Sequence, residues 1–69
     1  GTNPARAKFG DLLVRDHSHV AATRFTTRME KLAARLGKVF PRQFLDAKHT
    51  LLADVAWMKE QLAQLRATH

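Results

Sequence analysis

The segment from Arg42 to Ala67 constrains the fold most, because its apolar residues recur at alternating steps of three and four. That rhythm places a continuous apolar stripe on one face of a helix. The stripe consists of Phe44, Ala47, Leu51, Val55, Met58, Leu62 and Leu65, widened on one flank by Leu45, Leu52, Ala56 and Ala63. A helix over residues 42–67 would span about 39 Å, so we expect other helices to cover its stripe.

A second helix is predicted from about His19 to Leu36, with Gly37 as the residue that ends it. Glycine is the usual residue just beyond a helix C-terminus, and Pro41 shortly afterwards prevents continuation. The apolar stripe of this helix follows the same rhythm and consists of Ala22, Phe25, Met29, Leu32 and Leu36. We expect this stripe to pack against the 42–67 helix.

A shorter helix is predicted from Pro4 to about Arg15. Asn3 can cap its free amide groups, and proline suits the first turn because its missing N–H costs nothing there. The residues that follow carry no large apolar side chain and break the periodicity. This favours a loop, with Asp16 or Ser18 as the cap of the next helix.

Together these segments predict an all-α fold, a small three-helix bundle that forms one domain over residues 1–69. Its short first helix packs against an antiparallel hairpin of the other two. Because no glycine or proline enforces the break, the alternative is one continuous helix from Pro4 to Leu36. The resulting long hairpin could not enclose a core alone and would dimerise into a four-helix bundle. The chain opens without an initiator Met, so we expect a domain of a larger protein.

The lack of cysteine excludes disulfides and thiolate zinc as supports for this fold. A chain of 69 residues must then rely on helix packing or on self-association, and a homodimer is one possible form. No uninterrupted apolar run is longer than four residues, which excludes a membrane span. Membrane insertion of the 19–36 helix is disfavoured because we expect its apolar stripe to be used in the core.

The main functional feature is a row of cations beside the apolar stripe of the 19–36 helix. We call it the cationic ridge, and it consists of Arg24, Arg28, Lys31, Arg35 and Lys38. At about 100° per residue, steps of four and three put all five on one face, and Glu30 alone interrupts the positive charge. The net charge of the chain is +6, and the ridge accounts for most of it. A positive net charge of this size favours an anionic partner.

From the ridge we predict a non-catalytic protein–protein interaction or assembly module that docks an acidic protein surface. The alternative is sequence-non-specific binding of a nucleic-acid backbone by the same residues, with Thr23 and Thr27 donating hydroxyl hydrogen bonds to phosphates. Phe25 is the one aromatic residue among the cations and belongs to the apolar stripe, so base stacking is disfavoured. A sequence-specific reader is disfavoured too, because no short recognition helix follows a tight turn.

Trp57 has two interpretations. It falls about 120° from the apolar stripe of its own helix. Either the first helix packs over it, with Phe9 or Leu13 as partners, or it is an interface anchor for self-association or docking. The second interpretation rests on the frequency of tryptophan in binding hot spots.

The histidines do not form a metal-binding pattern. His17 and His19 are two residues apart, His49 is distant and His69 is terminal, so the ligand spacing of zinc motifs is absent. Asp16 beside His17 lacks an accompanying nucleophile, and a bundle this small leaves little room for a substrate cleft. We therefore expect no metal, no cofactor and no enzymatic activity.

Overall fold

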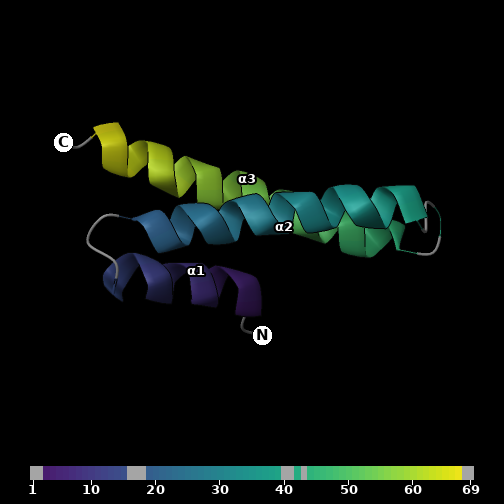
Figure 1. Cartoon of the computed structure of the whole chain (residues 1–69), viewed down its shortest axis with the longest axis horizontal. Helices are drawn as coiled ribbons and strands as arrows, with labels where there is room; N and C mark the ends of the chain where they lie inside the picture. The colour runs from purple at the N-terminus through teal and green to yellow at the C-terminus, as the bar shows by residue number, and fades with distance from the viewer. Residues whose placement is uncertain (1–2, 16–18, 40–41, 43, 68–69) are drawn as a thin grey trace.

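Three helices, each antiparallel to the one before it, form a small bundle (Figure 1). The helices are α1 (Pro4–Arg15), α2 (Val20–Val39) and α3 (Leu45–Ala67). The predicted three-helix bundle is confirmed, and α1 and α2 are separate helices rather than the single continuous one. The computed structural model describes residues 3–15, 19–39, 42 and 44–67.

The start of α1 is built as predicted, with Asn3 as its cap. Asn3 Oδ1 accepts a hydrogen bond from the backbone N–H of Arg6 at 3.1 Å, and the Asn3 carbonyl accepts one from Ala7 at 3.0 Å. Pro4 occupies the first turn, where its missing N–H removes no helical bond. The helix ends at Arg15, the predicted residue.

The chain turns into α2 at His19, whose φ of 61° lies in the left-handed region. That conformation costs a residue other than glycine roughly 1–2 kcal/mol, and here it separates α1 from α2. The His19 carbonyl accepts hydrogen bonds from the Thr23 N–H at 3.0 Å and the Thr23 hydroxyl at 2.9 Å. The predicted caps, Asp16 and Ser18, lie outside the described residues.

The prediction that Gly37 ends the second helix is wrong, because α2 continues through it to Val39. Gly37 does not adopt a positive φ. A Cβ atom added at this position would overlap the end of the Lys48 side chain from α3. The glycine therefore leaves room for the end of the Lys48 side chain and does not terminate α2.

The start of α3 also differs from the prediction, because the helix begins at Leu45 instead of residue 42. Its first backbone bond runs from the Lys48 N–H to the Phe44 carbonyl at 2.8 Å. Phe44 therefore lies just before the helix. Pro41, which we predicted for the first turn, lies outside the described residues.

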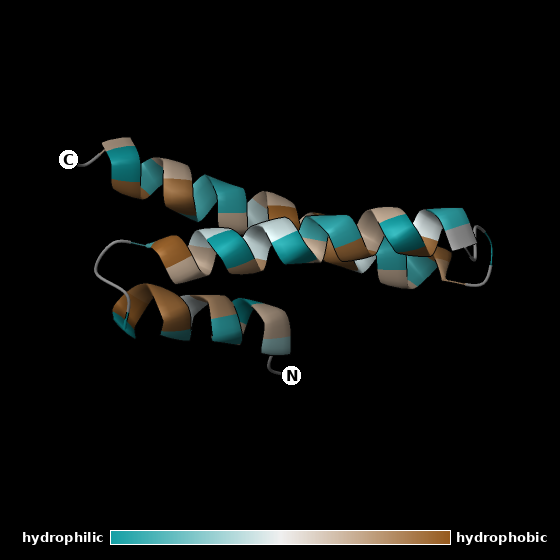
Figure 2. Ribbon diagram, viewed as in Figure 1, coloured by the Kyte–Doolittle hydropathy of each residue, from teal (hydrophilic) through white to brown (hydrophobic). Residues whose placement is uncertain are grey.

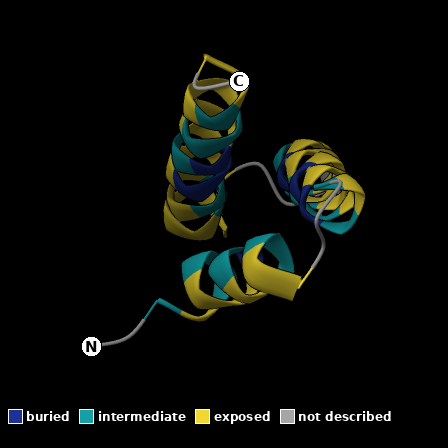
Figure 3. Cartoon of the chain, turned by 90° about the vertical axis from the view of Figure 1, so that its left-hand side faces the viewer, coloured by how far each residue is buried: buried dark blue, intermediate teal, exposed yellow. Residues whose placement is uncertain are grey.

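The core lies where all three helices meet, around the fully buried Phe9, Ala22 and Met58. Viewed from the end, α1 lies beneath both α2 and α3, whose buried residues face each other (Figure 3). The partly buried residues that pack against this core are Ala5, Leu12, Leu13, Phe25, Met29, Trp57 and Leu62.

The contact face of α2 is shifted from the predicted stripe. Leu32, predicted to be core, is 42% exposed, whereas Thr26 and Ala33 are only 3% and 0% exposed. Thr26 is tolerated there because its hydroxyl donates to the Ala22 carbonyl at 2.9 Å. Small side chains at the contact let α2 and α3 approach closely, and this leaves the larger Leu32 on the flank.

α1 covers only part of the α2–α3 hairpin. Its first turn bonds to Asp54 of α3, and Leu13 near its other end lines a small hollow together with Leu65. The helix therefore runs alongside residues 54–65 of α3, and no described helix covers residues 45–53 on that side (Figure 1). Apolar residues continue along α2 and α3 beyond the start of α1 (Figure 2).

Candidate functional site

The five cations of the ridge all belong to α2 and all have exposed side chains. They face away from the contact with α3, because the buried Ala22, Thr26 and Ala33 lie on the opposite side of the helix. From Arg24 to Lys38 the ridge extends for about 21 Å. The structure therefore brings the predicted site residues together on one solvent-facing surface.

Glu30, the one acid in α2, does not neutralise the ridge. Its carboxylate pairs instead with Lys59 of α3. Two further ion pairs between described residues join Arg6 to Asp54 and Arg15 to Asp11. Within the part of the chain that the structure describes, no ridge cation forms an ion pair with an acid, so the positive charge of the ridge stays available to a partner.

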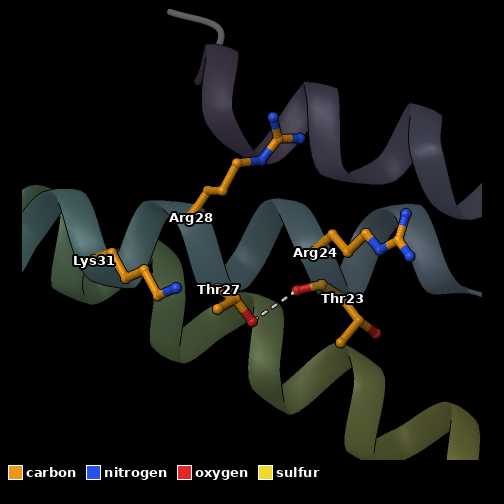
Figure 4. A pocket seen from close by; sticks show the side chains of 5 residues that line it. All are labelled: Thr23, Arg24, Thr27, Arg28 and Lys31. Atoms are coloured by element: carbon orange, nitrogen blue, oxygen red, sulfur yellow. Dashed lines mark hydrogen bonds between the residues drawn. The ribbon is translucent and has the colours of Figure 1, made fainter.

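An open hollow of about 540 Å³ lies on the ridge surface of α2. Arg28 extends toward the side on which α1 lies (Figure 4). The residues that line the hollow are Thr23, Arg24, Thr27, Arg28 and Lys31. The walls are the side chains of a single helix, so this is a cationic surface and not an enclosed substrate cleft.

The two threonines in this hollow use their hydroxyl hydrogens inside the helix. Thr23 donates to the His19 carbonyl at 2.9 Å, and Thr27 donates to the Thr23 carbonyl at 3.1 Å (Figure 4). Each hydroxyl has one hydrogen to donate. The structure therefore does not support the prediction that Thr23 and Thr27 donate to phosphates.

Trp57 packs against α1, as one of its two interpretations predicted. Its ring meets Phe9 edge-on, with centroids 5.7 Å apart and planes at 71°. The guanidinium of Arg6 lies over the same ring, 5.1 Å from its centroid. The side chain is nevertheless only partly buried. Its role as an interface anchor stays a prediction.

Sequence reasoning missed the polar cluster that holds the start of α1 against α3. Asp54 is 4% exposed, and its Oδ1 accepts hydrogen bonds from Arg6 Nε at 2.8 Å and Asn3 Nδ2 at 3.0 Å. A signal was present, since Asp54 lies three residues after Leu51 and four before Met58, within the apolar face. Its burial is compatible with charge because Arg6 pairs with it.

The described histidines do not gather into a site. His19 precedes α2 and His49 lies exposed on α3, whereas His17 and His69 fall outside the described residues. Among the residues that the structure describes, no three His, Asp or Glu side chains lie close enough together to bind a metal ion. Across the same residues, no helix has the length and apolar character needed to cross a membrane.

Comparison with protein-family models, curated proteins and solved structures finds no match to this chain. We therefore infer its function from the fold and from the charge and exposure of its side chains.

Proposed function

We propose that this chain is a non-catalytic docking module that binds an acidic protein surface through the cationic ridge of α2. The observation that carries the proposal is that all five ridge cations are exposed, while Glu30 is paired with Lys59. Such a surface attracts acidic groups and raises the rate of encounter with them.

The strength of ridge binding is limited by solvent. An exposed ion pair contributes only about 0.2–1 kcal/mol, and salt screens it. Five such pairs support weak binding that falls with ionic strength. A partner that binds more tightly needs apolar contacts in addition to the ridge.

The test uses charge reversal at two central ridge positions, Arg28→Glu combined with Arg35→Glu. The probe is a fluorescently labelled peptide rich in glutamate, titrated at low and moderate salt by fluorescence anisotropy. We expect the double variant to bind at least about tenfold more weakly while keeping its helical circular dichroism, because both side chains are exposed.

A matched control changes net charge equally but off the ridge, with Lys8→Glu combined with Arg66→Glu. Both residues are exposed, on α1 and α3. Equal weakening in the two double variants would show that bulk charge, not the ridge, governs binding. Tighter binding to a labelled DNA duplex, with affinity falling linearly in log salt, would assign the ridge to phosphates instead.

A further inference from the structure

The side of the hairpin that holds α1 is only half occupied. The first turn of α1 contacts Asp54, and residues 45–53 of α3 continue beyond it. At 1.5 Å per residue, these nine residues provide about 14 Å of uncovered helix. Alongside them runs the last part of α2, from Leu32 to Val39.

The surface next to this gap continues the face that binds α1. Leu32 lies seven residues after Phe25 and three after Met29, both of which pack against the core under α1. On α3, Leu51 lies seven residues before the buried Met58. We call this surface the open groove, and it consists of Leu32, Leu36, Ala47 and Leu51.

The residues of the open groove form an apolar floor that is partly accessible to solvent. Leu32 is 42% exposed, Leu36 and Leu51 are half-buried, and the small Ala47 is exposed. A helix could approach closely at Ala47. Contact between the exposed leucine surface and water is unfavourable in free energy.

The charges beside the open groove select the occupant. Arg28 and Arg35 lie four residues before and three residues after Leu32, so they flank it on the outer edge of α2, and both are exposed. The facing edge of α3 carries the neutral, exposed Thr50 and, one turn before it, the exposed Asp46, so the positive charge lies only on the α2 edge. An occupant must therefore combine an apolar face with acidic residues along one flank. A second copy of this chain fits poorly, because it also has a net charge of +6.

We propose that the open groove binds an acidic amphipathic helix of a partner protein, which lies end to end with α1. This inference rests on the proposed function, since Arg28 and Arg35 belong to the ridge. The length of about 14 Å accommodates roughly two and a half helical turns. That is enough for apolar anchors at positions i, i+3 or i+4, and i+7 of the partner helix.

The test compares two labelled peptides of identical composition and about 18 residues, long enough for marginal helicity. One has leucines at helical spacing on one face and glutamates on the others, and the second is its scrambled version. Binding is measured by fluorescence anisotropy at low salt. We expect the amphipathic peptide to bind at least about tenfold more tightly than the scrambled peptide.

Two leucine variants test whether the open groove causes the preference for the amphipathic peptide over the scrambled one. Leu32 and Leu52 are both 42% exposed. Leu52 lies seven residues before Lys59, on the flank of the Glu30–Lys59 pair and away from Asp54. We expect Leu32→Gln to bring the affinities of the two peptides to within about twofold of each other, because it removes apolar contact with the amphipathic peptide. The affinity of the scrambled peptide should not fall, because the ridge is intact. Leu52→Gln should leave the preference unchanged.

The outcomes separate this inference from the proposed function. Equal binding of both peptides would overturn the groove and leave the ridge as a docking surface. No binding of either peptide would overturn both. Equal loss of preference in Leu32→Gln and Leu52→Gln would overturn the groove, as would a homodimer in sedimentation that Leu32→Gln abolishes.

Discussion

The two ends of the α2–α3 hairpin differ in one respect, the presence of a third helix. In the covered half, α1 buries Phe9 against Ala22 and Met58, and all three are fully buried. In the open half, Leu32 is 42% exposed, and Leu36 and Leu51 are only half-buried. At one end, α2 and α3 therefore enclose a core together with α1. At the other end they contact only each other among the described helices.

The covered half therefore provides most of the stability, and the open half provides surface for binding. Burial of apolar area is the main favourable term in folding, and it is concentrated where α1 lies. The open half retains apolar area that a partner could cover, next to the exposed cations of the ridge.

The largest effect is expected from Phe9→Ala in the covered half. Phe9 is fully buried and contacts Trp57, so truncation should cost about 3–5 kcal/mol in the free energy of unfolding. Because a domain of this size has little stability to lose, most of the protein should unfold. Urea titration followed by circular dichroism measures the loss.

The comparison variant for Phe9 is Leu32→Ala in the open half. Its side chain is 42% exposed, so less transfer free energy is lost, and we expect under about 1.5 kcal/mol. Comparable losses in the two variants would contradict the concentration of stability in the covered half.

An intermediate effect is expected from Asp54→Asn at the boundary between the two halves. The change removes the charge that Arg6 Nε contacts at 2.8 Å, and the cost should be about 1–3 kcal/mol. Because Arg6 also lies over the Trp57 ring, the tryptophan fluorescence of the folded protein should change.

Asp46→Asn is the control for Asp54→Asn, because Asp46 is an exposed acid of the same helix. We expect it to cost less than about 1 kcal/mol, the contribution of an acid in the first helical turn, and to leave the fluorescence unchanged. If Asp54→Asn behaved like Asp46→Asn, the polar cluster would not be what holds the start of α1.

The smallest effects are gains from alanine at the two helical glycines. Gly10→Ala, in α1, should stabilise the protein by about 1 kcal/mol, because nothing lies within 4 Å of the added Cβ. Gly37→Ala, in the open half, should gain less, because the end of the flexible Lys48 side chain must move aside. Thermal unfolding of both variants measures the two gains, and a larger gain at Gly37 would contradict the contact between Gly37 and the end of Lys48.

The residues that the sequence placed correctly are those with strong local signals. Asn3 followed by Pro4 marks a helix start through backbone chemistry alone, and the loss of periodicity after Arg15 marked the break between α1 and α2. The ridge was also readable, because helical periodicity alone decides which side chains share a face. Its exposure agrees with that pattern.

The errors arose where local signals compete with packing. Gly37 carries the usual signal for a helix end, yet α2 continues to Val39, and the end of the Lys48 side chain from α3 lies against the glycine. Leu32 matched the apolar rhythm as well as Met29 did, but Thr26 and Ala33 form the buried contact. Periodicity predicts the apolar face of a helix to within about one residue. Which residues of that face are buried depends on how the side chains of the two helices fit together.

Local sequence signals were enough to predict that the chain is helical, where α1 begins and ends, and that five cations share one face of α2. Those properties depend on residues within a few turns of one another. Tertiary packing decided that Asp54 is buried against Arg6, that Glu30 pairs with Lys59, and that α1 runs along only part of the hairpin. Each of these depends on how far one helix extends along another, and that follows from the fit of side chains distant in sequence.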